Sequence, residues 1–163
     1  MKEILQQYAA YNSWANQRIF ETINNLPDDR IDREIVSSFS SIKKTVLHML
    51  DAESIWWQRI KLNEKIKVPS EDFNGTISEL FKILGQQSAE WKDWVDHASE
   101  TQLQHVFAYQ NSKKEQFKQP VYEMILHLFN HGTYHRGQLV TMLRQSGVEK
   151  IPATDFIVFC RKK

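Results

Sequence analysis

The sequence contains a single cysteine, Cys160, among 163 residues, so an internal disulfide cannot form. A chain without disulfides suits the reducing cytosol, and we expect a cytoplasmic protein. Its first residues, MKEILQQYAAY, lack the unbroken apolar run of ~7–15 residues that a secretory signal requires. No apolar run in the sequence approaches the ~20 residues of a membrane-spanning helix, so we expect a soluble protein without membrane partners.

An excess of charge of one sign is also missing. The 21 basic and 20 acidic residues give a formal net charge of +1, which argues against a nucleic-acid-binding surface. We expect the basic end, Arg161, Lys162 and Lys163, to be a solvated tail rather than a ligand site. The sequence also contains no internal repeat and no low-complexity segment.

Apolar and aromatic residues, in contrast, are plentiful. Hydrophobic residues make up 41% of the chain and aromatic residues 12%, including five tryptophans and nine phenylalanines. This composition can fill a packed core and argues against a disordered chain. The length is typical of one domain, so we expect a single domain over residues 1–163.

Apolar residues recur at spacings of three and four in four segments, which predicts four long helices. Ser40 or Ser41 can cap the second helix, and Pro120 stands where the fourth begins, since a first-turn residue needs no N–H donor. Pro27 ends the first helix. The helices are expected over approximately residues 2–25, 41–62, 76–97 and 121–145.

The remaining segments are shorter. Strand-forming residues surround a turn at Asn111, Ser112 and Lys113, which predicts a hairpin over residues 104–118. Irregular structure is expected between the helices and at the end of the chain, over residues 28–38, 63–75 and 151–160. Together the segments predict an all-α fold, an antiparallel four-helix bundle with a small β-hairpin before the last long helix.

The last predicted helix contains the segment LHLFNHGTYHRGQL, with His127, His131 and His135 at spacings of four. A step of four residues on a helix turns by about 40° and rises about 6 Å, so His131 and His135 share one face. His48 lies on the second helix beside small residues that suit the wall of a cleft. Histidine is a common ligand of zinc and similar ions, and three histidines leave a coordination position open.

Spacing alone is a weak signal, because many H-x-x-x-H pairs are surface or core histidines held by hydrogen bonds. His127 can be a fourth ligand, although the preferred interpretation is that it supports the site or packs beside it. His97 and His105 lie in polar surroundings, and we expect them to be surface residues without a function.

Acidic residues near the histidines have two interpretations. Asp51 or Glu53 can orient His48 through a hydrogen bond, but acids on a helix are more often simply solvated. The residues between His131 and His135 are Gly, Thr and Tyr, with no glutamate to act as a general base. A protease of the H-E-x-x-H type is therefore disfavoured.

Several short motifs occur together along nearly the whole chain. They are YNSWAN at 11–16, SFSSI at 38–42, AE at 52–53, YHRGQ at 134–138 and PATDF at 152–156. The most specific is H-x-x-x-H-R-G-Q, combined with a histidine upstream. This set resembles the DinB family, small DNA-damage-inducible or YfiT-like bundle proteins.

The resemblance implies a four-helix bundle in which three histidines hold a divalent metal ion. By motif position, these ligands are His48, His131 and His135. Zinc or nickel is the expected ion, although three imidazoles also suit copper or iron. The resemblance further implies transfer of a low-molecular-weight thiol in some members, a small-molecule substrate or thiol as partner, and frequent homodimers.

Three functions stay open at this point. The first is a metal-dependent enzyme of the thiol S-transferase or hydrolase type, with Tyr134, Asn12 and Trp14 as candidate pocket contacts. The second is a non-enzymatic metal-binding stress-response protein, and the third is a structural bundle that acts as a partner module. Arg136 is expected to pair with Asp155 and fasten the C-terminal tail.

Overall fold

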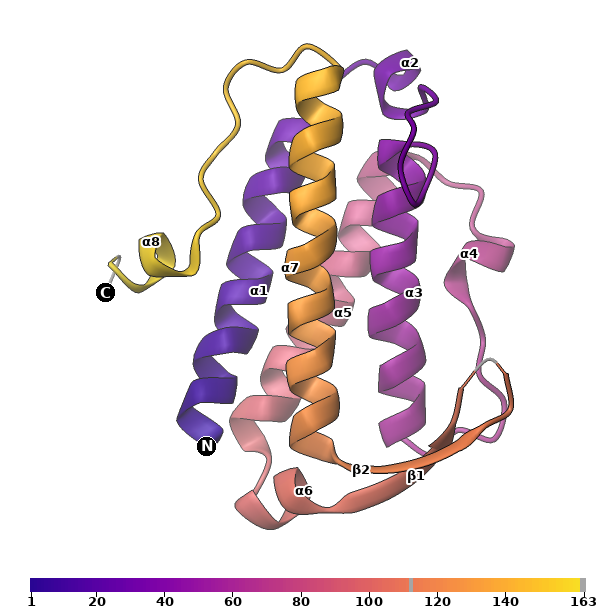
Figure 1. Cartoon of the computed structure of the whole chain (residues 1–163), viewed down its shortest axis with the longest axis vertical. Coiled ribbons are helices and arrows are strands. Elements are labelled where there is room, and N and C mark those ends of the chain that lie inside the picture. The colour runs from indigo at the N-terminus through magenta and orange to yellow at the C-terminus, as the bar shows by residue number, and fades with distance from the viewer. Residues whose placement is uncertain (112, 162–163) are drawn as a thin grey trace.

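Four long helices form a bundle in the computed structural model, which describes residues 1–111 and 113–161 (Figure 1). The predicted turn residue Ser112 and the tail residues Lys162 and Lys163 lie outside the described residues. The predicted bundle, with a hairpin before the last long helix, is confirmed. Its long helices are α1 (Lys2–Ile23), α3 (Ile42–Ile60), α5 (Ile77–His97) and α7 (Val121–Gln145).

The hairpin consists of β1 (Val106–Gln110) and β2 (Gln116–Pro120), which pair antiparallel with Ala108 opposite Lys118. It crosses the end of the bundle at which α3 finishes and α7 begins (Figure 1). A short helix, α6 (Glu100–Gln104), joins α5 to the hairpin. The hairpin therefore closes one end of the seam between α3 and α7.

Three segments predicted to be irregular each contain a short helix instead. These are α2 (Asp28–Ile31), α4 (Pro69–Asp72) and α8 (Phe156–Cys160). Pro69 is the first residue of α4, where its fixed φ suits a helix and its missing N–H is not needed. Ile31 ends α2 and is only 2% exposed, so its burial holds the turn against the bundle.

Side-chain caps set the starts of two long helices. The Oγ of Ser41 accepts a hydrogen bond from the N–H of Lys44 at 3.2 Å, which identifies Ser41 as the cap of α3. Thr76 and Glu79 form a reciprocal capping box at the start of α5. Such caps satisfy N–H groups that have no partner inside the helix, and each contributes about 1 kcal/mol.

The connection between α3 and α5 runs back along the outside of α3. Lys67 N donates to Gln58 Oε1 at 2.8 Å, and Ser70 N donates to Asp51 Oδ1 at 2.8 Å. Later residues of the connection therefore bond to earlier residues of α3. Consequently α5 runs in the same direction as α3, whereas α1 and α7 run in the opposite direction (Figure 1).

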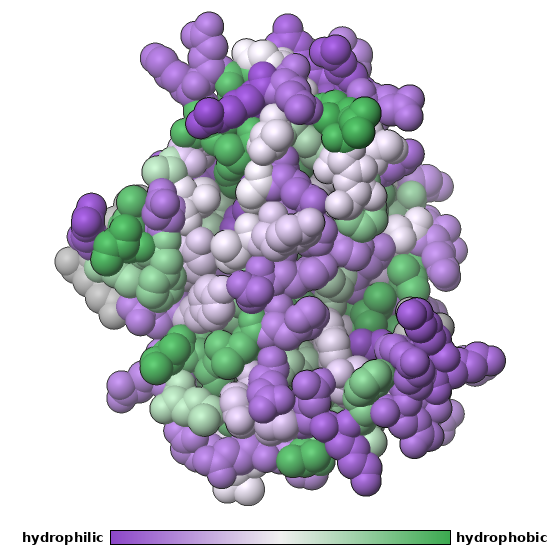
Figure 2. All heavy atoms as spheres, viewed as in Figure 1, coloured by the Kyte–Doolittle hydropathy of each residue, from purple (hydrophilic) through white to green (hydrophobic). Residues whose placement is uncertain are grey.

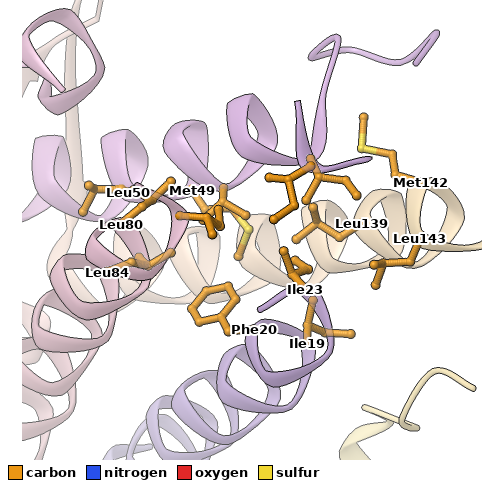
Figure 3. Close-up of a cluster of buried hydrophobic side chains, with 14 of the residues drawn as sticks. Ile19, Phe20, Ile23, Met49, Leu50, Leu80, Leu84, Leu139, Met142 and Leu143 are labelled. Carbon is orange, nitrogen blue, oxygen red and sulfur yellow. The ribbon is translucent and has the colours of Figure 1, made fainter. Parts of the chain in front are cut away.

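Two clusters of buried apolar side chains fill the bundle, one toward each end. Figure 3 shows the cluster away from the hairpin, where residues of all four long helices meet, including Ile19, Met49, Leu80 and Leu139. The second cluster contains Leu5, Trp91, Val95, Ile125 and Phe129. Truncating such a buried side chain to alanine typically costs about 2–5 kcal/mol.

A layer of polar side chains lies between the two clusters along the bundle. Its buried members come from all four long helices: Asn12, Asn16, Glu53, Ser88 and Arg136. Polar groups are buried without large cost only when they are hydrogen-bonded, so this layer requires a connected network.

The visible surface is mixed in character. In the view of Figure 2, hydrophobic residues lie in several separate patches among hydrophilic ones. Single exposed apolar residues such as Ile4 and Leu62 are ordinary on a folded protein. Among the helices of residues 1–111 and 113–161, none combines the length and apolar content that a membrane span needs.

Candidate metal centre

The three predicted ligands come from two adjacent helices that run in opposite directions. His48 lies on α3, and His131 and His135 lie one turn apart on α7. Because the two helices are antiparallel, the middle of α3 faces the middle of α7. The structure therefore brings His48 beside His131, which is 83 positions away in the sequence.

The ring nitrogens of these histidines converge on a common point. His131 Nε2 lies 3.1 Å from His48 Nε2 and 2.9 Å from His135 Nε2. One ligand atom from each ring can be chosen so that all lie within 4.8 Å of one another. Nitrogens bound to one zinc ion at ~2.0–2.1 Å, with angles of ~90–110°, lie about 2.9–3.4 Å apart. The observed spacing fits three ligands of a single ion.

Gln138 sets the tautomer of His135. Its Oε1 lies 2.7 Å from His135 Nδ1, while its Nε2 donates to Ser38 Oγ at 3.0 Å and to Tyr134 Oη at 3.2 Å. An amide oxygen only accepts, so His135 Nδ1 carries the hydrogen and Nε2 keeps its lone pair. A hydrogen bond to the far nitrogen is the usual way in which proteins orient a ligand histidine.

Phe39 covers one side of the histidine group. Its ring stacks on His48, with centroids 4.1 Å apart and planes at 23°, and it meets the edge of His135 at 5.8 Å. Phe39 stands two residues before the Ser41 cap, so the cap that starts α3 also places this ring. An apolar cover of this kind reduces the access of water to the imidazoles.

The environment keeps the imidazoles neutral. Burial, together with smaller effects of the neighbouring His135, His48 and His127, lowers the pKa of His131 to about 4. Burial also lowers the pKa of His48, with a smaller effect from His135, and burial lowers the pKa of His135. A neutral imidazole is the form that binds a metal ion, so near pH 7 the three rings are ready to act as ligands.

Comparison with known proteins identifies the family of this chain. Residues 1–161 match the model of the DinB family. The chain is 32% identical over 155 residues to Protein DinB of Bacillus subtilis strain 168, covering 90% of this chain and 87% of that protein. The chain belongs to the DinB family.

Solved structures share the fold of this DinB-family chain. YfiT from Bacillus subtilis, described as "a probable metal-dependent hydrolase with an unusual four-helix bundle topology", matches with a TM-score of 0.71 at 14% identity, over 90% of both chains. A DinB-like protein from Bacillus subtilis matches with a TM-score of 0.69 at 15% identity, over 91% of this chain and 98% of that one. A DinB-like protein from Bacillus cereus matches with a TM-score of 0.64 at 14% identity, over 85% and 89%.

The other histidines of this DinB-family chain lie outside the converging group. Within the described residues, that group comprises His48, His131 and His135. His127 lies beside it, with its ring centroid 5.9 Å from that of His131, as in the preferred sequence-based interpretation. His97 is exposed on α5, where its Nδ1 lies 2.8 Å from the backbone oxygen of Asp93.

Asp51 and Glu53 do not orient His48. Asp51 accepts from the N–H of Ser70 and so fastens the connection between α3 and α5. Glu53 is 5% exposed, which contradicts the prediction of a solvated acid, and its carboxylate accepts from Asn12 and Ser88 instead of orienting His48. Its position four residues after Met49 and three after Leu50, on the apolar face of α3, is the sequence signal that could have indicated burial.

Glu53 instead belongs to the buried polar layer. Its carboxylate accepts from Ser88 Oγ at 2.8 Å and from Asn12 Nδ2 at 3.1 Å. Burial raises the pKa of Glu53 to about 7, although these two hydrogen bonds and the charge of Arg136 act against the increase. Trp91 Nε1 donates to the backbone oxygen of Glu53 at 3.0 Å, which further ties α5 to α3.

Arg136 connects this layer to α7. Its Nη1 donates to Asn12 Oδ1 at 2.7 Å and to Asn16 Oδ1 at 2.8 Å, and its Nη2 donates to Thr133 Oγ1 at 2.8 Å. The side chain is buried, and burial lowers the pKa of its guanidinium. The network thus links all four long helices at the level of the histidines.

The predicted pair between Arg136 and Asp155 is wrong. In the described part of the chain, Arg136 forms no ion pair with Asp155, because the guanidinium points into the bundle. The tail is fastened on α1 instead. Tyr11 Oη donates to the backbone oxygen of Thr154 at 2.8 Å, and the ring of Phe156 meets that of Tyr11 edge-on at 5.1 Å.

The predicted pocket contacts separate in the structure. Tyr134 lies at the site, with its ring 5.0 Å from that of His135 and its side chain 60% exposed. Asn12 belongs to the buried network, and Trp14 packs against Tyr11 and Phe159. Sequence reasoning missed Phe39 as a contact of the histidines, because nothing local indicates that a residue two positions before a helix cap contacts side chains of two helices.

Proposed function

We propose that this protein is a metal-dependent enzyme in which His48, His131 and His135 hold one divalent ion, zinc or nickel. The observation that carries the proposal is the convergence of three Nε2 atoms, with spacings of 2.9 and 3.1 Å about His131. Structural zinc sites usually have four protein ligands, whereas sites with three leave a position for water or substrate. When bound, the ion would lower the pKa of a coordinated water or thiol and provide a nucleophile near neutral pH.

The residues around the histidines have separate tasks in this proposal. Gln138 holds His135 in the tautomer that presents Nε2, and Phe39 keeps water from the outer side of His48. Tyr134 lies at the exposed edge, where its phenol can donate a hydrogen bond to a substrate. Partial burial lowers the pKa of His127, so this ring is neutral near pH 7 and can accept a proton from a molecule beside it.

Two reaction types are consistent with this set of ligands. A three-imidazole site can serve hydrolysis or the transfer of a thiol to an electrophile, because either nucleophile gains from the same lowering of its pKa. The fold similarity to YfiT, described as "a probable metal-dependent hydrolase", supports the inclusion of ester and amide substrates in a first screen. Low-molecular-weight thiols, supplied together with a reactive bromide as the electrophile, test for thiol transfer.

The test begins with elemental analysis of protein purified without a histidine tag. We expect about one divalent ion per chain in the wild type, none in His131→Ala, and full content in the control His97→Ala, whose ring lies on the surface of α5. Metal-loaded protein is then screened with esters, amides and thiol plus monobromobimane. Unchanged metal content in His131→Ala would overturn the site. Turnover of no substrate by fully loaded protein would favour the non-enzymatic alternative.

A further inference from the structure

A small recess lies between α3 and α7 on the hairpin side of the histidines. Its volume is about 180 Å³, and three elements line it: α3, α7 and the hairpin. We call it the aromatic recess and define it by its lining residues, Trp56, Tyr109, Gln119, Glu123, Met124 and His127.

His127 lies between the aromatic recess and the metal centre. The ring of His127 lies 5.8 Å from that of Trp56 and 5.9 Å from that of His131. On α3, Ala52 stands one turn from both His48 and Trp56 and contributes only a methyl group between them. A molecule in the recess would therefore lie about one helical turn, or ~6 Å, from the nearest predicted ligand.

Aromatic rings form one wall of the recess. Trp56 and Tyr109 meet edge to face, with centroids 4.9 Å apart and planes at 71°. Behind them, the guanidinium of Arg59 lies 4.5 Å from the Trp56 ring and 5.2 Å from the Tyr109 ring. Arg59 Nη2 also donates to the backbone oxygen of Gln110 at 2.8 Å. This packing holds the wall in place, and such a wall suits a flat apolar group.

Glu123 places a carboxylate in the recess. Its oxygens lie 3.3 Å from Tyr122 Oη and 3.4 Å from Gln119 Nε2, which are long contacts to neutral donors. Over residues 1–111 and 113–161, the ion pairs are Lys92 with Asp96 and His97 with Asp93, so no cation among these residues pairs with Glu123. Glu123 is in the first turn of α7, where a negative charge stabilises the helix. That stabilisation does not require the carboxylate to face the recess.

We propose that the aromatic recess binds the substrate through a small aromatic ring that carries an ammonium or similar cationic donor. The ring packs on Trp56 and Tyr109, the cation bonds to Glu123, and the reacting part extends past His127 toward the metal centre. An apolar cavity of about 150 Å³ can hold benzene, so the observed volume admits one ring with a short side chain. This assignment of a substrate class rests on the proposed function.

Metal-free protein tests the recess separately from the metal. Nitrogen-15-labelled protein is titrated with benzylamine, which has the ring and the cation, and with benzyl alcohol, which has the ring alone. The indole N–H signal of Trp56 is assigned from the spectrum of Trp56→Phe. We expect saturable shifts of this signal, with benzylamine binding about tenfold more tightly, the effect of one charge-assisted hydrogen bond.

Two variants test whether Glu123 causes the preference for benzylamine over benzyl alcohol. Glu123→Gln should abolish the difference between the two probes, while the control Glu149→Gln, exposed in the loop after α7, should retain it. Thermal melting shows that each variant is folded. Equal affinities for both probes in the wild type would overturn the cationic class, and no saturable Trp56 shift would overturn the recess. Neither result depends on metal binding, whose absence would instead overturn the proposed function.

Discussion

His135 and Arg136 are consecutive on α7, but their side chains enter two different polar clusters. His135 joins two other imidazoles whose Nε2 atoms face one another. Arg136 enters the buried network, where Asn12, Asn16 and Thr133 accept its hydrogen bonds. The first cluster contains three neutral imidazole rings. In the second, the guanidinium of Arg136 donates to amide and hydroxyl oxygens.

The histidine cluster is therefore a candidate binding site, whereas the buried network supports the fold. In the network, Arg136 and Glu53 bond to complementary partners on α1 and α5, in addition to the bond from Arg136 to Thr133 within α7, so the network holds the bundle together. In the histidine cluster, lone pairs converge without enough donors to satisfy them, and a cation is the group that would satisfy them. We expect changes in the network to affect stability and changes among the histidines to affect metal affinity.

The largest expected effect comes from removing the cation of the network. Arg136→Met should lower the free energy of unfolding by about 3–5 kcal/mol, because it leaves the buried Oδ1 atoms of Asn12 and Asn16 without this donor and removes the positive charge near Glu53. Urea denaturation measures the change. The control Arg144→Met, exposed in the last turn of α7, should stay within about 0.5 kcal/mol of the wild type. Similar losses in both variants would contradict the role of the network.

Removing a predicted ligand should instead lower the metal affinity and leave the stability nearly unchanged. His131→Ala should weaken metal binding by more than about 100-fold, which exceeds the usual effect of changing a group behind a ligand. The free energy of unfolding of the metal-free protein should change little, because this side chain is only partly buried. Competition with a chelator measures the affinity. In the control His127→Ala, which removes the ring beside the site, a comparable loss would make His127 a ligand.

The ionisation of Glu53 should make the stability of the wild type fall, relative to that of Glu53→Gln, as the pH rises. Its pKa is about 7 in the folded protein, above the ~4.3 of an unfolded chain. Its contribution to stability is therefore complete below pH ~4.3 and is lost as the pH rises through 7. Glu53→Gln does not titrate, so between pH 5 and 8 it should gain on the order of 2 kcal/mol relative to the wild type. Urea denaturation at several pH values checks this, and a constant difference would contradict it.

Two glycines of α7 give the smallest expected effects, in opposite directions. A Cβ on Gly132 would lie 2.8 Å from Asn12 Oδ1 and 3.1 Å from Arg136 Nη1, whereas a Cβ on Gly137 would meet nothing within 4 Å. Gly132→Ala should therefore destabilise the protein by about 1–2 kcal/mol through crowding of the network. Gly137→Ala should stabilise it by about 0.5–1 kcal/mol, the usual gain in a helix. Thermal melting of both variants compares them, and equal shifts would show that Asn12 can move aside.

Much of the fold was predictable because its signals are local. The apolar spacing of three and four located the long helices, and the strand formers around Asn111 located the hairpin. The short helices α2, α4 and α8 were missed, since a single turn contains too few residues to establish a period. The spacing of Glu53 from Met49 and Leu50 could have indicated its burial, but its partners, Asn12 and Ser88, lie on other helices and could not be read from its own segment.

Helix geometry alone places His131 and His135 on one face of α7, so their proximity could be predicted from their spacing. The antiparallel course of α3 and α7, and the direction of Arg136 into the bundle, became known only from the folded chain. These features depend on contacts between residues far apart in the chain, and no local spacing encodes them. The position of His48 opposite His131 is therefore a property of helix packing, to which the sequence contributed only the residue types.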